Sequence, residues 1–430
     1  MYKCSDYNIL TDYDGSCLLY NSFKGTLAKI DSDCKADLES LNCSSRHADA
    51  FVKQGFWVDA GHDELGEIKE LNRKAKFEQK EVHVTLKLTD ECNFRCFYCY
   101  QAHAPNVLDS TKMDAVKKYL ARICENGIES VRLNLFGGEP TLNLAVAIDL
   151  ADYLKSKKIE HKFSMATNGY LLTPSAVADL ERIGVSSVQV TLDGPEHVHD
   201  KMRYLADGGK TYGVILDNIA HILDATDIQV IIRHNLTKNN VRHIPELYED
   251  LHRRGLFKSG RVTVYANEAI KHLTTRDSAD DGSIYFDSRE DYARENFRLL
   301  EMRLQYGFKV APTKLMPSSC PFDILNNHVV GTNLDLEYCT SSGSDMSVGA
   351  INPDGSVTKT EHDLGRVSRN PFDKPKCAAC KLLPVCMGGC ALMERLGKST
   401  CTFVKYVLDD YVRLMYVSRR KSQAGSEGGI

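Results

Sequence analysis

The chain has 430 residues, and its 54 basic and 58 acidic side chains give a net charge of −4. This length excludes a peptide or a disulfide-stapled mini-protein and corresponds to about three domains. A nearly balanced charge provides no overall basic field to attract nucleic acid or an anionic membrane. The N-terminus lacks the apolar core of a signal peptide, and no apolar run is long enough to span a bilayer. We therefore expect a cytoplasmic protein with neither a nucleic-acid nor a membrane partner.

Residues 1–60 are interpreted as a small winged-helix-like module. Asp14-Gly15 lies between two apolar-rich stretches and predicts a β-hairpin. Apolar residues at helical spacing predict a helix through Phe23, Leu27 and Ile30. A second helix is expected to end at Gly55. Residues 61–80 are charge-dense with little apolar pattern, so we interpret them as a connector.

From residue 82 the sequence alternates strand-like and helical patterns. The strand-like stretches are Val82–Thr89, Val131–Phe136, His161–Ala166, Val188–Leu192, Ile228–Arg233 and Val262–Tyr265. One of the intervening helices opens at Thr173-Pro174, a capping residue followed by proline at the first helical position. Six consecutive β/α units predict an α/β fold with a parallel sheet, either open and doubly wound or curved into a partial (β/α)6 barrel.

Polar and glycine-rich residues follow strand after strand in this region, which we take as a domain spanning residues 81–310. They are Cys92–Cys99, Gly137-Gly138-Glu139-Pro140, Thr167-Asn168-Gly169, Asp193-Gly194-Pro195 and Arg233-His234-Asn235. Loops at the carboxyl ends of parallel strands converge on one cavity. We therefore expect the functional site at this edge of the sheet.

Cysteine is the one unusual feature of the composition, with 15 residues unevenly distributed. In a reducing cytoplasm, many cysteines indicate metal ligands or catalytic thiols more often than disulfides. Two closely spaced groups fit that description, Cys92–Cys99 and Cys377–Cys401. Free buried thiols are the default interpretation for the irregularly spaced Cys4, Cys17, Cys34, Cys43 and Cys124.

Cys92, Cys96 and Cys99 form a C-x3-C-x2-C loop directly after a predicted strand. Three thiolates can hold one [4Fe-4S] cluster, and the missing fourth ligand leaves one iron open to a molecule other than protein. Spacing alone leaves two other interpretations open, namely three reduced thiols in a loop or a zinc site completed by a distant residue.

This loop, with Tyr98 before its last cysteine and GGEP after the next strand, resembles the radical S-adenosylmethionine (radical SAM) superfamily over residues 82–266. In that family the open iron binds S-adenosylmethionine, and one electron splits it into methionine and a 5′-deoxyadenosyl radical. The resemblance implies that Tyr98 lies near the adenine and that the methionine amino group is received by Gly137, Gly138 and Glu139. It also implies that the cofactor's ribose and carboxylate are lined by Thr167, Asn168, Asp193, Arg233 and Asn235.

Regular alternation stops in residues 311–421, where cysteine, glycine and proline dominate. The pattern Cys377-x2-Cys380-x5-Cys386-x3-Cys390 indicates metal, although C-x2-C alone would first indicate zinc. With Cys401, it resembles the SPASM extension of radical SAM enzymes, which carries two auxiliary [4Fe-4S] clusters. The resemblance implies an outer cluster held by Cys377, Cys380, Cys386 and Cys401. The inner cluster would be held by Cys320, Cys339 and Cys390.

The inner cluster departs from the family pattern C-x9-15-G-x4-C. Gly355 stands 16 residues after Cys339, but Thr360 occupies the place of the last cysteine. The fourth ligand is therefore not identified, and the inner cluster would be open to substrate or ligated by oxygen or nitrogen. Glu361 is the one candidate catalytic residue, because it and His362 could serve as ligand or base. An ordinary surface loop is the alternative.

Peptide-modifying SPASM enzymes often begin with a small leader-recognition domain, and residues 1–60 resemble such an element. We expect strand addition of a precursor's leader peptide here, reported by the fluorescence of the sole tryptophan, Trp57. A docking cap for the barrel is the alternative. A final amphipathic helix precedes residues 422–430, which we expect to be disordered.

These modules together predict a maturase of ribosomally made peptides that forms a thioether or carbon–carbon crosslink. It would take electrons from a donor such as flavodoxin or ferredoxin. One alternative is a sulfatase-type maturase that oxidises a Ser or Cys side chain. Another is a non-enzymatic iron–sulfur or zinc protein for electron transfer or binding, although GGEP would then have no purpose.

Overall fold

The computed structural model describes residues 1–270, 283–310, 315–318, 320–342, 346–360 and 367–427. The chain divides into two compact units. The terminal unit comprises Met1–Glu78, Ser288–Ile324 and Arg369–Ile430, and the barrel unit comprises Gln79–Asp287 and Leu325–Ser368. Within the described ranges, each helix is too short or too polar to cross a bilayer.

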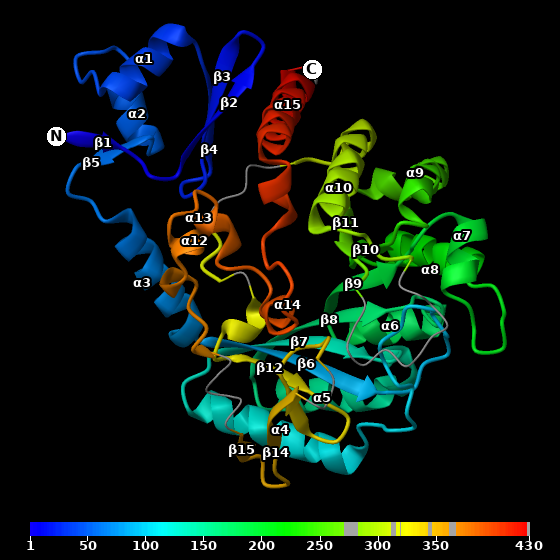
Figure 1. The fold of residues 1–430 in the computed structure, drawn as a ribbon. Coiled ribbons are helices and arrows are strands. Elements are labelled where there is room, and N and C mark those ends of the chain that lie inside the picture. Colours follow the sequence, from blue (N-terminus) through cyan, green and yellow to red (C-terminus); the bar gives the residue numbers. More distant parts are fainter. Residues whose placement is uncertain (271–282, 311–314, 319, 343–345, 361–366, 428–430) are drawn as a thin grey trace. The chain divides into compact units, whose positions relative to one another are not determined.

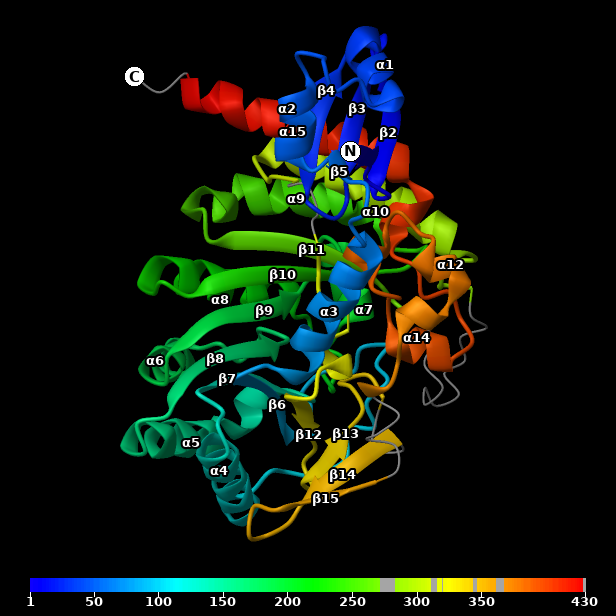
Figure 2. The same ribbon diagram turned by 90° about the vertical axis from the view of Figure 1, so that its left-hand side faces the viewer.

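A curved sheet of ten strands forms the barrel unit, in the order β11-β10-β9-β8-β7-β6-β12-β13-β14-β15 (Figure 1, Figure 2). The six neighbouring parallel strands are β6 Glu81–Thr89, β7 Ser130–Gly137, β8 Glu160–Thr167, β9 Val185–Thr191, β10 Gln229–Leu236 and β11 Val262–Glu268. Each coincides with one strand expected from the sequence. The predicted α/β fold with a six-stranded parallel sheet is thus confirmed, and β11 remains an edge strand, so the barrel is partial.

Helices cover one face of this sheet (Figure 2). They are α4 Ser110–Glu125, α5 Leu144–Ser156, α6 Pro174–Arg182, α8 Tyr212–Ala225 and α9 Ile244–Arg253, whereas the short helix α7 Glu196–Met202 lies beyond the carboxyl end of β9. Thr173 caps α6, because its side chain accepts a hydrogen bond from the N–H of Ala176, and Pro174 follows as expected. Side chains alternate between the two faces of a strand. In β6, Val84 and Leu86 are buried, whereas Thr85 between them faces the other way and stays half-buried.

Four short strands from the cysteine-rich region extend the sheet beyond β6. They are β12 Asn327–Val330, β13 Asp335–Glu337, β14 Ser347–Ile351 and β15 Val357–Lys359. Lys87 of β6 anchors them, since its Nζ lies 2.5 Å from Oε1 of the buried Glu337. Residues 311–421 are therefore shared between the two units rather than forming one domain, because β12 pairs with the edge of β6 and covers it.

The terminal unit begins with the antiparallel sheet β2 Asn8–Tyr13, β3 Ser16–Asn21 and β4 Thr26–Ile30. The hairpin predicted at Asp14-Gly15 is confirmed, and both residues have positive φ. The first predicted helix is wrong, because strand β4 takes its place. A spacing of three residues puts Leu27 and Ile30 on opposite faces of β4, and both faces are covered by apolar cores.

Two layers cover this sheet. One contains β1 Tyr2–Cys4, α1 Ser32–Ser40, α2 Ala48–Gln54, which ends at Gly55 as predicted, and β5 Trp57–Asp59. The other is α15 Leu408–Glu427. Trp57 is 1% exposed and its Nε1 donates to the carbonyl of Leu38, so its fluorescence reports on this core rather than on a surface ligand.

The predicted connector contains a well-anchored helix, α3 Glu64–Phe77. Ile68 is fully buried in an apolar cluster with Phe23 and Leu383 of the same unit. Glu64 is also buried, and its carboxylate accepts hydrogen bonds from the Ser5 hydroxyl at 2.7 Å and the Asp6 N–H at 2.9 Å. Polar anchoring of this kind leaves little apolar periodicity in the sequence, which explains why the pattern did not predict a helix.

Replacing Leu86 by Ala tests the packing of the parallel sheet. The side chain is fully buried on a central strand, so its removal should lower the free energy of unfolding by about 2–5 kcal/mol. Leu142→Ala is the matched control in the same unit, because Leu142 is 44% exposed and should cost less than about 0.5 kcal/mol. Urea unfolding followed by circular dichroism measures both, and equal losses would contradict this account of the core.

Candidate active site

The cysteine loop follows β6 and is held by main-chain hydrogen bonds to the segment after α7. Phe97 donates to the carbonyl of Met202 at 3.2 Å, and Arg95 donates to that of Tyr204 at 2.8 Å. In return, the N–H of Ala206 donates to the carbonyl of Asn93 at 2.8 Å. The segment that follows β9 and α7 therefore fixes the shape of a loop that follows β6.

The three cysteines of this loop are free thiols, each partly buried. Burial raises the pKa of Cys92 to about 11 and that of Cys96 to about 12, and neighbouring cysteines of the loop add to both shifts. Burial also raises the pKa of Cys99. Cysteine binds metal as the thiolate, and these raised pKa values keep the thiols protonated near neutral pH. Binding of a cationic metal centre would displace the protons. Three clustered sulfur donors fit an iron–sulfur cluster.

Gly137 ends β7 and Gly138 follows it, and both glycines bring this segment against the start of the cysteine loop. Gly138 donates its N–H to the carbonyl of Thr89 at 2.8 Å, and Glu139 donates to that of Glu91 at 2.8 Å. A Cβ atom on Gly137 would lie 2.3 Å from the Thr89 oxygen, and one on Gly138 would lie 2.2 Å from the Glu91 oxygen. Both positions therefore require glycine. The two glycines serve the close approach of β7 to the cysteine loop and do not merely form a turn.

Glu139 links β7 to the end of β8. It is fully buried; its Oε1 accepts hydrogen bonds from the hydroxyls of Thr141 and Thr167, both at 2.6 Å, and its Oε2 accepts from the N–H of Asn168 at 2.7 Å. Burial raises the pKa of this carboxyl group, and these hydrogen bonds oppose the shift. A carboxylate offers about four acceptor positions, so Oε2 retains capacity for a further donor.

A second network joins Tyr98 to the ends of β9 and β10. The Tyr98 hydroxyl donates to the carboxylate of Asp193 and accepts from Nη1 of Arg203 at 2.6 Å and Nδ2 of Asn235 at 3.1 Å. Asp193 also accepts from the N–H of Asn235 at 2.7 Å. Burial raises the pKa of Asp193, and Arg203 opposes that shift most strongly. Nε of Arg203 is buried without a hydrogen-bond partner among the described residues, which leaves a donor for an anionic group.

The predicted residues thus form two groups beside the cysteine loop. Asn168 belongs to the first, and its Nδ2 lies 2.7 Å from Oδ1 of Asn93 and 4.0 Å from Sγ of Cys92. Arg233 joins the second through a hydrogen bond from its Nε to Oδ1 of Asn235 at 2.9 Å. The sequence interpretation missed Arg203, which lies ten residues beyond Asp193, after α7, without any glycine-rich signal.

Four cysteines of the terminal unit gather around α12 Pro375–Ala378 and α13 Leu383–Cys386. Burial raises the pKa of Cys377 and Cys386, and both shifts are increased by Cys380 and Cys401. Nζ of Lys405 lies 3.6 Å from Sγ of Cys401 and can offset thiolate charge. This donor set fits a metal centre with four sulfur ligands.

The candidate ligands of the inner cluster are divided between the units. Cys320 and Cys390 lie near each other in the terminal unit, since Cys390 contributes to raising the pKa of the buried Cys320 after the larger effects of burial and Asp323. Cys339 belongs to the barrel unit. Thr360 follows β15, and its hydroxyl donates to the carbonyl of Ser347 at 3.2 Å. Glu361 and His362 lie outside the described residues.

Gly138→Ala tests the close approach of β7 to the cysteine loop. The new Cβ would displace the Glu91 carbonyl beside Cys92, so we expect at least a tenfold loss of affinity for S-adenosylmethionine, the ligand implied by the sequence resemblance. Gly213→Ala is the control, because a Cβ there meets no atom within 4 Å. Equilibrium dialysis of the cluster-loaded variants measures the effect; unchanged affinity in the Gly138 variant would refute the steric argument.

Arg203→Gln tests the buried network around Asp193. The substitution leaves a carboxylate that is 0% exposed without its nearest cation, so we expect a loss of about 3–5 kcal/mol in unfolding free energy. Arg132→Gln breaks the exposed pair with Glu81 and should cost less than about 1 kcal/mol. Similar urea midpoints for the two variants would show that Arg203 does not compensate Asp193.

Residues 86–251 match the model of the Radical SAM superfamily. The chain is 24% identical to Fe-coproporphyrin III synthase of Methanosarcina barkeri, over 71% of this chain and 82% of that protein. It is 21% identical to the radical SAM cyclopropyl synthase TigE of Paramaledivibacter caminithermalis, over 93% of each chain.

Two solved structures share the fold. One is SuiB of Streptococcus suis bound to its precursor peptide SuiA, with a TM-score of 0.53 at 14% identity over 93% of this chain and 98% of that chain. The other is native anSMEcpe with bound AdoMet and Cp18Cys peptide, with a TM-score of 0.60 at 17% identity over 78% and 99% of the chains. With the cysteine loop and the glycine contact in place, residues 86–251 form a radical SAM domain.

Proposed function

We propose that the chain is a radical SAM maturase that acts on a ribosomally made precursor peptide and installs a thioether or carbon–carbon crosslink. The observation that carries the proposal is the meeting of the cysteine loop with Gly138 and Glu139 at the carboxyl ends of β6 and β7. The peptide substrate is supported by the likeness in fold, across nearly the whole chain, to a structure that contains a precursor peptide.

The residues of the barrel unit divide the work between binding the cluster and orienting the cofactor. Cys92, Cys96 and Cys99 would hold a [4Fe-4S] cluster. Oε2 of Glu139 would accept a hydrogen bond from an ammonium group, and Nε of Arg203 would donate one to a carboxylate. When bound, this cluster and S-adenosylmethionine supply the 5′-deoxyadenosyl radical that abstracts a hydrogen atom from the substrate.

The face of the sheet opposite to its helices is suited to a peptide. The residues that point away from the helices are mostly polar and half-buried, and they include Asn134, Ser164, Gln189, Arg233 and Tyr265. The Tyr265 hydroxyl donates to Oε1 of Gln189 at 2.5 Å, so this wall is ordered across β9 to β11. A peptide backbone must satisfy its N–H and C=O groups when it leaves water, which polar side chains allow.

The sheet of the terminal unit is the proposed site of leader binding. Apolar cores cover both of its faces, so strand addition has only the edges of β2 and β4 available. Arg413 and Arg419 of α15 already donate to the carbonyls of Asp12 and Leu27 on these edge strands, so an added strand would have to pair with the remaining main-chain groups.

We further propose two auxiliary clusters, a protein electron donor and a cytoplasmic location. Cys377, Cys380, Cys386 and Cys401 would hold the outer cluster, and Cys320, Cys339 and Cys390 the inner one. Crosslinking removes two hydrogen atoms from the peptide, so an electron acceptor is needed after the first abstraction. A flavodoxin or ferredoxin would deliver the initiating electron.

Cys96→Ala tests the assignment of the catalytic cluster. Anaerobic reconstitution of the unmodified chain should yield about 12 irons, since three cubanes hold four each, and the variant should lose about four of them. Reductive cleavage of S-adenosylmethionine should be abolished in the variant and unchanged in Cys124→Ala, which removes a partly buried cysteine of α4. If Cys96→Ala still cleaved S-adenosylmethionine, the cysteine loop would not hold the catalytic cluster. Zinc in place of iron in the reconstituted protein would overturn the enzyme proposal.

The same preparation tests the peptide substrate with precursor candidates encoded beside the gene. A crosslinked product loses two hydrogen atoms and resists fragmentation between the linked residues. The same mass change in a peptide that fragments throughout would instead support oxidation of a Ser or Cys side chain. Cleavage of S-adenosylmethionine without any peptide modification would count against the peptide substrate and leave the radical SAM assignment intact.

A further inference from the structure

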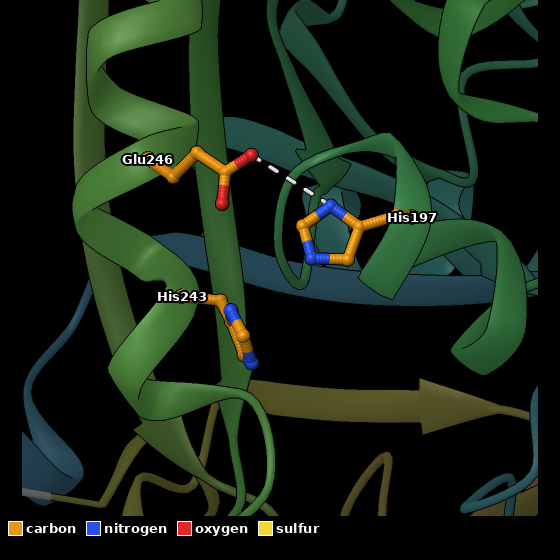
Figure 3. Close-up of side chains that lie close together, drawn as sticks. All are labelled: His197, His243 and Glu246. Carbon is orange, nitrogen blue, oxygen red and sulfur yellow. Dashed lines mark ion pairs between the residues drawn. The ribbon is translucent and has the colours of Figure 1, made fainter.

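Two histidines and a glutamate converge where α7 meets the start of α9 in the barrel unit. His197 lies on α7, His243 ends the short helix η2 Val241–His243, and Glu246 lies one turn later on α9 (Figure 3). The candidate ligand atoms of the three residues all lie within 4.8 Å of one another. Nδ1 of His197 is 3.7 Å from Oε1 of Glu246, and the two imidazole rings are 5.4 Å apart.

This donor set is the one that divalent first-row metals prefer. Two imidazole nitrogens and one carboxylate oxygen bind Zn²⁺ or Fe²⁺ and leave coordination positions open. Metal–ligand bonds of about 2 Å require ligand atoms roughly 3.3 Å apart. Rotation of the exposed side chains of His197 and Glu246 would bring the ligand atoms to that separation. His243 and Glu246 are three residues apart across the junction of η2 and α9, a spacing that lets their side chains approach each other.

The surroundings leave room for such a centre. His197 and Glu246 line a surface pocket of about 370 Å³, together with Lys210, Tyr212 and Asp250. Those neighbours already have partners of their own, because Lys210 pairs with Glu196 at 2.8 Å and Tyr212 donates to Asp250 at 2.8 Å. The pocket can therefore admit the waters that would complete the coordination of a cation.

We propose that His197, His243 and Glu246 bind a divalent transition-metal cation that ties α7 to α9. α7 follows the loop that begins at Asp193, and η2 follows Asn235. Nδ2 of Asn240 already joins the two loops, since it donates to the carbonyls of Asp193 at 2.8 Å and Asn235 at 3.0 Å. The cation would add a second tie to the segments that carry two predicted cofactor residues, without taking part in the radical chemistry.

Zinc titration of the full-length protein tests this site. The chain is reconstituted anaerobically so that its cluster cysteines are occupied, freed of loose metal, and titrated with ZnCl₂ by calorimetry. We expect the unmodified chain and His252→Gln, which changes an exposed histidine of α9, to bind one more Zn²⁺ than His197→Gln or Glu246→Gln. Each ligand variant should lose at least tenfold in affinity, and equal titrations of all four proteins would overturn the proposal.

Hydrogen exchange provides an independent measurement that other zinc sites would not mimic. Zn²⁺ should slow exchange in residues 193–202 and 237–246 of the unmodified chain and of His252→Gln, and leave it unchanged in His197→Gln. The variants change exposed side chains, so their melting temperatures without added metal should equal that of the unmodified chain. Identical exchange with and without Zn²⁺ in every protein would also reject the site. Neither measurement uses S-adenosylmethionine, so this proposal and the proposed function fail separately.

Discussion

The site depends on one close contact, the approach of the end of β7 to the backbone that follows β6. Gly138 donates to the carbonyl of Thr89, and the space beside it is too small for any side chain. The contact sets the start of the cysteine loop relative to Glu139. Glu139 then reaches the N–H of Asn168 at the end of β8. A single backbone approach without Cβ atoms therefore aligns three consecutive strand ends.

The same edge of the sheet buries three ionisable side chains. Glu139, Asp193 and Arg203 are almost fully excluded from water, and burial raises the pKa of both carboxyl groups. Replacing such groups by apolar ones often leaves stability unchanged or improves it, whereas removing one partner is costly. Perturbed carboxyl groups that gather where loops converge are typical of functional sites, although structural ion pairs shift pKa values as well. Here the buried carboxyl groups lie beside the cysteine loop, which favours a functional site over a purely structural ion pair.

The sequence predicted the six parallel strands and the polar residues at their ends, because period-two burial and strand-end loops leave local patterns. It missed Arg203, whose role arises only when the segment after α7 folds back over the cysteine loop. It placed a helix at β4 because Leu27 and Ile30 face two different cores at a spacing that also suits a helix. It did not predict α3, because Glu64 anchors that helix through polar contacts that leave no apolar pattern in the sequence. Each error concerns an element whose environment comes from distant parts of the chain.

The terminal unit shows how far such distant packing extends. Leu18 and Tyr20 of β3 share one core with Val412 and Met415 of α15, so the two ends of the chain are folded together. Leu383 and Met387, which flank Cys386, pack against Phe23 and Ile68. Residues 1–60 are thus half of a core rather than an autonomous module, and removing them would expose the apolar face of α15. A peptide strand added at the edge of β2 or β4 would therefore bind to the same compact unit that holds the four clustered cysteines.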